Sequence, residues 1–228
     1  ADKTISGTFQ CLDEVIAVGN YWNRRSYTDC NGNPNLDPTV VPGSLVTTGN
    51  ASSIGPSRDG RVKPDITSPG DNTFAAVESN WKAGLVGSGQ QNLMAIGCQH
   101  VISGGTSNSC PGVAGIAALY LQKNPTATAI QVQQAIVNTA RSDNFTGAVP
   151  NKSWGYGKAD AFAALTGIKT VTQPRDTAIC ENENVSFTAN FNDGPGETYQ
   201  WQVNQGAGFS NLANSLPYSG VTTNTLSI

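Results

Sequence analysis

The chain has 228 residues, of which 38% are hydrophobic and 13% charged, and its formal net charge is −3. This length allows one large domain, or one domain with a smaller companion. No basic run stands out, which argues against a nucleic-acid partner, and no apolar stretch approaches the ~20 residues that span a bilayer.

The composition is typical of an exported protein. Gly (25) and Pro (12) are plentiful, whereas Lys and Arg together number 13. No spacing of the five cysteines is typical of a zinc site, so disulfides are predicted, with buried free thiols as the alternative. The cysteines are Cys11, Cys30, Cys98, Cys110 and Cys180. An odd number leaves at least one of them without a partner in this chain.

The two ends of the sequence indicate a segment of a longer protein. The chain begins with Ala1, carries no signal segment, and stops inside an alternating pattern at 226–228.

The first half predicts short strands joined by long loops. Residues 13–19 contain an apolar run closed by Gly and predict a buried strand. Residues 20–60 are polar and rich in Gly and Pro and predict loops. A short strand at 62–66 and a turn at 69–70 follow, and 84–103 predict further strands.

Three helices are predicted in the second half. The first begins at Pro111, since proline is favoured at the first helical position. One face of it carries Val113, Ile116, Ala117, Tyr120 and Leu121. The second begins near Thr128, which forms a capping box with Gln131, and its inward face carries Val132, Ala135, Ile136 and Thr139. The third is predicted at 158–165.

Composition changes after Gly167. A linker at 171–178 is followed by alternating apolar residues at 185–191 and 199–203, which predict half-buried antiparallel strands. The residues that remain are too few for a complete immunoglobulin-like sandwich of about 100 residues.

Ser107 is the candidate nucleophile. It follows the tight stretch 104–106 and precedes the first helix, whose free N–H groups and positive dipole end would favour a developing oxyanion. The alternative is that Ser107 is only a helix N-cap. The G-x-S-x-G elbow of α/β-hydrolases is excluded, because Ser109 stands where its last Gly would be.

Residues 105–115, GTSNSCPGVAG, resemble the nucleophile motif of the subtilisin-like serine peptidases. Three more blocks resemble that family in order and spacing. They are VIAVG at 15–19, SSIGPSRDGRVKPDITSPG at 52–70 and GYGKADA at 155–161. The resemblance covers roughly residues 1–167.

The resemblance implies a serine-type endopeptidase that acts on protein or peptide substrates through an acyl-enzyme, with Ser107 as nucleophile. It implies an α/β fold, a three-layer sandwich with a mostly parallel sheet. No cofactor is implied. The family often binds calcium, but this segment has no dense carboxylate cluster, and Asp59, Asp65 and Asp71 are predicted to be loop and turn residues.

The sequence departs from the family in its other catalytic parts. The D-[ST]-G, HGTH-type and AAGN-type segments, which carry the Asp, the His and the oxyanion Asn, do not occur. Family order places them before Ala1, so the missing N-terminal half of the domain is an expected partner, and this segment alone is expected to be inactive. His100 is the sole histidine, and a structural or surface role is preferred for it.

The cysteines and the tail complete the hypothesis. Pairs Cys98–Cys110 and Cys11–Cys30 are the preferred guesses, although spacing cannot decide connectivity. The tail resembles immunoglobulin-like repeats of secreted bacterial adhesins and enzymes. That resemblance implies a Cys180 bridge to a later strand and a core role for Trp201.

The sequence is therefore compatible with two functions. The first is a secreted or cell-surface bacterial serine endopeptidase, with residues 1–167 as the C-terminal part of the peptidase domain and 168–228 as a linker and a truncated immunoglobulin-like domain. The alternative is a non-catalytic, adhesin-like surface protein on a degenerate peptidase scaffold.

Overall fold

The computed structural model describes residues 5, 9–47, 51–168, 170–172, 174, 177–180, 183–191, 198–206 and 208–228. Part of the predicted linker at 171–178 lies outside these residues. The chain divides into two compact units, Ala1–Leu165 and Thr166–Ile228. None of the helices in the described part of the chain has the length and apolarity needed to cross a membrane.

The first unit mixes short strands with helices. Its elements are η1 (Phe9–Cys11), β1 (Val18–Trp22), β2 (Ser26–Thr28), β3 (Pro34–Leu36), β4 (Ile66–Asp71), β5 (Thr73–Ala76), α1 (Ser79–Gly87), η2 (Gln91–Leu93), β6 (His100–Ser103), α2 (Thr106–Lys123), α3 (Ala129–Asn138) and α4 (Ala161–Thr166). β1 pairs with β4 in parallel, whereas β2 pairs with β3 and β5 with β6 in antiparallel register.

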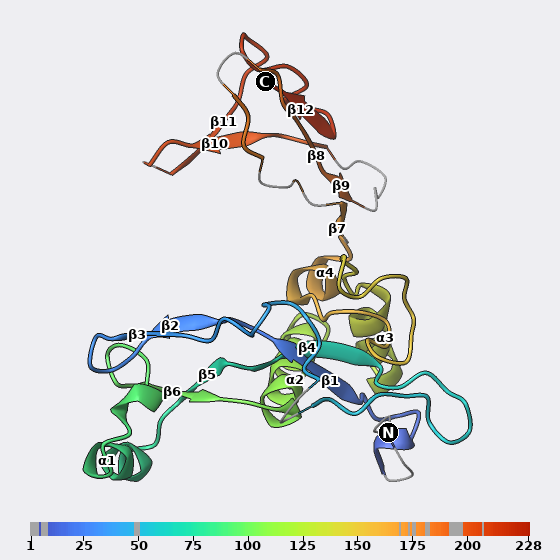
Figure 1. The fold of residues 1–228 in the computed structure, drawn as a ribbon. Helices are drawn as coiled ribbons and strands as arrows, with labels where there is room; N and C mark the ends of the chain where they lie inside the picture. The colour runs from blue at the N-terminus through green and yellow to red at the C-terminus, as the bar shows by residue number, and fades with distance from the viewer. Residues whose placement is uncertain are drawn as a thin grey trace. The chain divides into compact units, whose positions relative to one another are not determined.

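The centre of this unit is the β1–β4 pair, against which α2 packs, with α3 packed against α2 (Figure 1). The buried core cluster consists of Ile66, Val113, Val132, Ile136, Ala140 and Ala164. The α/β class is confirmed as a mixture of helices and strands. The mostly parallel sheet is not seen, because among the described residues β1 and β4 are the only two strands that pair in parallel, and an isolated parallel bridge joins Thr67 to Lys158.

The turn predicted at Pro69-Gly70 is wrong. Both residues lie inside β4, where Tyr21 faces Pro69 and Trp22 faces Asp71, so Gly70 is the extra residue of a bulge. A bulge is one of the few strand positions that tolerate Pro and Gly, because the ladder is already interrupted there. The Pro-Gly pair that predicted a turn therefore marks a bulge in β4.

Other predicted element boundaries also differ from those in the structure. α2 begins at Thr106 rather than Pro111, so Pro111 lies inside the helix. The loop region 20–60 holds the β2–β3 pair, and 84–103 includes the end of α1 in place of a strand. The capping box at Thr128 is confirmed: the N–H of Gln131 donates to the Thr128 hydroxyl, and the backbone N–H of Thr128 donates to Gln131 Oε1.

The second unit is built of short strands. They are β7 (Thr170–Thr172), β8 (Ser186–Thr188), β9 (Asn190–Phe191), β10 (Gln202–Asn204), β11 (Phe209–Asn211) and β12 (Thr225–Ser227). β10 pairs with β11, β12 with β8 and β7 with β9, all antiparallel. The antiparallel strands predicted at 185–191 and 199–203 are thus present as β8, β9 and β10.

Candidate active site

Ser107 is the second residue of α2, and its side chain is exposed. The N-cap position belongs to Gly105, whose φ of 92° and ψ of 173° lie in a region that only glycine adopts without strain. The alternative role of Ser107 as helix cap is therefore wrong, because the cap lies two residues earlier. Among the described residues, none forms a hydrogen bond with the Ser107 hydroxyl.

The start of α2 presents free amide groups beside that hydroxyl. The N–H of Asn108 donates to the carbonyl of Gly105 at 3.0 Å. Within the described residues, the N–H groups of Thr106 and Ser107 have no acceptor, as expected for a helix start. These two donors and the positive end of an 18-residue helix can stabilise negative charge close to the Ser107 Oγ.

A buried network of polar side chains contacts the first turn of α2. Asp71, at the end of β4, accepts a hydrogen bond from the N–H of Gly105 at 3.1 Å. Asn20, in β1, donates to Asp71 at 2.5 Å. Ser109, in the first turns of α2, lies 3.0 Å from the carbonyl oxygen of Ser68. The prediction that Asp71 is a turn residue is wrong, because Asp71 is the last residue of β4, and the sequence predicted no site role for Asn20.

His100 and Ser107 are not joined. His100 is exposed at the start of β6 and pairs with Ala76 of β5. No hydrogen bond connects it to Ser107 in the part of the chain that the structure describes.

The disulfide guesses are wrong. Cys30 is bonded to Cys98, and both cysteines pack against the small core of Leu85, Met94 and Val101. Cys11, Cys110 and Cys180 are free, and Cys110 is exposed on α2 rather than packed. Both predicted pairs joined cysteines close in sequence, whereas the two bonded cysteines are 68 residues apart and come together only in the folded chain.

The described residues hold no group of three or more His, Cys, Asp or Glu side chains placed to bind a metal ion. Asp65 lies in a bend just before β4, as predicted, where it is buried and pairs with Lys63 at 2.6 Å. Asp59 is exposed and pairs with Arg61 at 2.8 Å.

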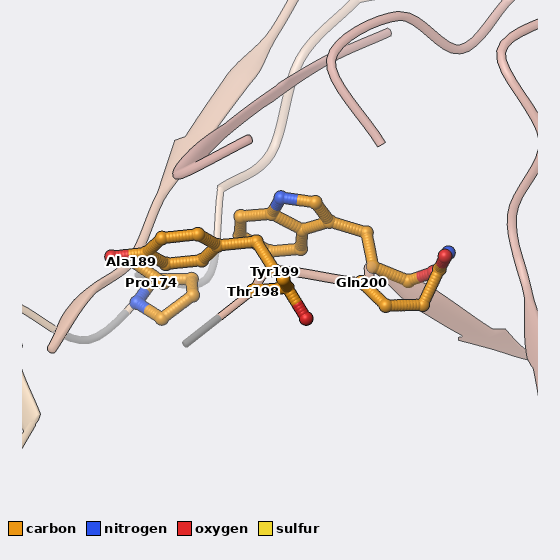
Figure 2. Close-up of a pocket in the computed structure, with 6 residues that line it drawn as sticks. Pro174, Ala189, Thr198, Tyr199 and Gln200 are labelled. Carbon is orange, nitrogen blue, oxygen red and sulfur yellow. The ribbon is translucent and has the colours of Figure 1, made fainter. Parts of the chain in front are cut away.

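The second unit contains a pocket of about 360 Å³ (Figure 2). Its lining residues are Pro174, Ala189, Thr198, Tyr199, Gln200 and Trp201. Trp201 is half-buried and its indole N–H donates to the carbonyl of Thr223 at 2.8 Å, which fixes the ring. Half-exposed aromatic rings beside polar groups are typical of binding pockets.

Residues 5–157 match the Peptidase_S8 model, described as the subtilase family. The chain belongs to the subtilase family.

Curated subtilases align with part of this chain. The serine protease AprX of Bacillus subtilis is 34% identical over 121 residues, which are 53% of this chain and 26% of AprX. The subtilisin-like protease SBT4.13 of Arabidopsis thaliana is 37% identical over 106 residues, 45% of this chain and 14% of that protease. The chain thus spans about a quarter or less of the length of these subtilases.

Solved subtilase structures also align with it. The CspB protease of Clostridium perfringens has a TM-score of 0.46 at 23% identity, covering 70% of this chain and 28% of CspB. Fervidolysin from Fervidobacterium pennivorans has a TM-score of 0.40 at 21% identity, covering 76% and 21%. The subtilase match ends at residue 157, before the second unit begins.

Proposed function

We propose that this chain is part of the catalytic domain of a serine endopeptidase and that Ser107 is its nucleophile. The observation that carries the proposal is the exposed Ser107 hydroxyl at the start of α2, beside two free N–H groups, in a member of the subtilase family. In a complete domain, β1 and β4 would be neighbours in a larger, mostly parallel sheet of a three-layer sandwich.

The proposed reaction begins when Ser107 Oγ attacks a peptide carbonyl carbon and gives its proton to a histidine. The carbonyl oxygen becomes an oxyanion, which the Ser107 N–H binds. The histidine then protonates the leaving amine as the C–N bond breaks, and water hydrolyses the acyl-enzyme by the same steps.

His100 is exposed and forms no bond with Ser107 among the described residues, so the histidine, its aspartate and the oxyanion asparagine would come from the N-terminal half of the domain. That half is the proposed partner of this segment. An exported location is also proposed, supported by the Cys30–Cys98 disulfide, since such bonds persist in oxidising compartments.

The second unit is proposed to be part of an immunoglobulin-like accessory domain, supported by its short antiparallel strand pairs. Its aromatic pocket favours a second candidate function, a surface protein that binds carbohydrate or protein through this unit without catalysis. In that case Ser107 would have no chemical role.

The coding DNA on both sides of residues 1–228 tests the proposal first. In-frame segments of the D-[ST]-G, HGTH and AAGN types upstream are expected for the peptidase. The full-length protein should then cleave labelled casein, and its Ser107→Ala variant should not. Equal activity of the two proteins, or a start codon directly upstream of Ala1, would favour the binding function instead.

A further inference from the structure

The nucleophilic role of Ser107 does not explain the buried hydrogen-bond network of Asn20 and Asp71 beside the start of α2. We propose that Asn20 and Asp71 are positioning residues: they fix the Gly105 peptide, and through it the first turn of α2 that carries Ser107. This inference rests on the proposed function of Ser107 and names the groups that hold it in place.

Asp71 supplies the cap that α2 lacks. A Ser, Thr, Asp or Asn at the N-cap would bond to the helix through its own side chain, but Gly105 has none. In a capping box, the third helical residue bonds to the N-cap N–H. That residue is Asn108, and its amide points instead to the carbonyl of Gly70 at 3.4 Å. Asp71 reaches the Gly105 N–H in its place, from strand β4.

Asn20 locks Asp71 in one orientation. Its side-chain amide donates to Asp71 Oδ2 at 2.5 Å, and its Oδ1 accepts the backbone N–H of Asp71 at 3.0 Å. The same Oδ1 lies 3.3 Å from the hydroxyl of Ser109, one turn into α2. Asn20 is 0% exposed and Asp71 is 5% exposed, so water does not compete for these bonds. The pair therefore joins β1, β4 and α2 at one point.

The buried carboxylate of Asp71 also depends on the N–H donors around it. Among the described residues no Lys or Arg pairs with it, in contrast to Asp65 at the other end of β4. Burial of a carboxylate without a cation is costly unless N–H donors compensate. The compensation here comes from Gly105, from Asn20 and from the positive end of α2. Part of this compensation is lost when the helix start moves away from Asp71.

Position matters because reacting groups must be held closely. A displacement of about 1 Å can reduce a rate about 100-fold. If the Gly105 peptide rotates, the Oγ and the N–H of Ser107 both move, whereas groups that bind the rest of a substrate do not. Loss of the pair should therefore lower kcat and leave KM nearly unchanged.

The test exchanges the two side chains in the full-length protein. In Asn20→Asp two carboxylates face each other, and in Asp71→Asn the new NH2 group faces another donor, either the Asn20 NH2 or the Gly105 N–H. In the double variant N20D/D71N the bond between the two side chains forms again with donor and acceptor exchanged, and side-chain oxygens still accept from the backbone N–H groups of residue 71 and Gly105. Asp65→Asn is the matched control, because it alters the buried carboxylate at the opposite end of β4.

We expect each single variant to lower kcat on a fluorogenic peptide by about 10- to 100-fold with KM within threefold, and the double variant to recover most of that loss. D65N should lower the melting temperature and leave kcat unchanged. Amide hydrogen exchange at 104–109 should rise in the singles and return in the double, which provides a readout independent of activity.

Two results would overturn the proposal in distinguishable ways. If wild type cleaves the peptide, Ser107→Ala does not, and the single variants keep wild-type kcat or the double variant shows no recovery, the positioning role is wrong while the nucleophile stands. If wild type and Ser107→Ala have equal activity, the proposed function fails, and the positioning role fails with it.

Discussion

The ammonium group of Lys158 lies 2.6 Å from the Oδ2 of Asp143, and the Lys158 side chain is almost completely buried. The same Nζ donates to the carbonyl of Gly43 at 2.7 Å and lies 4.7 Å from the ring centre of Tyr21. Lys158 lies in the block GYGKADA at 155–161. One buried cation thus connects β1, the loop at Gly43 and the loop after α3.

Replacement of this cation should destabilise the first unit through its unpaired partner. We expect Lys158→Leu to lower the free energy of unfolding by about 2 kcal/mol, below the ~3–5 kcal/mol of fully buried pairs because the Asp143 side chain is one-third exposed. The double variant K158L/D143N should recover most of the loss. Urea unfolding followed by tryptophan fluorescence measures both, and equal losses in the two variants would contradict the prediction.

Asp143 should make stability depend on acidic pH. Burial by itself would raise the pKa of Asp143. The hydrogen bond and charge of Lys158, with the N–H groups of Thr146 and Phe145, lower this pKa by more than burial raises it, so the pKa of Asp143 lies below its ordinary value. A carboxyl whose folded pKa is depressed contributes stability above its unfolded pKa, and that contribution is lost as pH falls through the folded pKa.

The unfolding free energy of wild type should therefore fall more steeply below about pH 4 than that of Asp143→Asn. Unfolding curves at pH 3 to 6 make the comparison. Parallel pH profiles for the two proteins would show that Asp143 contributes nothing in this range.

The disulfide prediction concerns Cys30 and Cys98. When the protein is unfolded without a reductant and then alkylated, Cys30 and Cys98 should stay unmodified, and Cys11, Cys110 and Cys180 should be labelled. Because the bond closes a long loop, the C30A/C98A variant should lose about 4 kcal/mol in the chain-entropy account. Protection of Cys110 or Cys11 from alkylation would instead favour the pairs expected from sequence.

Gly70 should not tolerate a side chain. A Cβ there would overlap Ser109 Oγ, Asn20 Oδ1 and the carbonyl oxygen of Gly105. We expect Gly70→Ala to cost about 3 kcal/mol or more, since the contacts include backbone. Gly115→Ala is the control: apart from its chain neighbours and the nearby backbone of α2 itself, no atom lies within 4 Å of its added Cβ, and alanine inside α2 should stabilise by about 0.5–1 kcal/mol. Similar melting temperatures for both variants would contradict the account.

Local signals in the sequence predicted local structure well. The capping box of Thr128 depends on residues within one turn, and it is present at the start of α3. The bulge at Gly70 depends on how β4 meets β1, so Pro69-Gly70 was misinterpreted as a turn. The β2–β3 pair was missed because short polar strands have no apolar period to detect.

The candidate site was only partly visible for the same reason. Ser107 could be found because its whole motif is contiguous. Asn20 and Asp71 are 51 residues apart, and neither has a pattern around it that indicates a partner. Their adjacency arises from the parallel pairing of β1 with β4, which the sequence does not encode locally. A polar residue directly after a buried strand was the one signal available.

The most direct test of the central claim is the reaction of the full-length protein with a fluorophosphonate, followed by peptide mass spectrometry. We predict a single adduct on Ser107, absent in Ser107→Ala and retained in Ser79→Ala, which alters another exposed serine at the first turn of a helix. Equal labelling of wild type and Ser107→Ala, or none of wild type, would contradict the claim that Ser107 is an activated nucleophile.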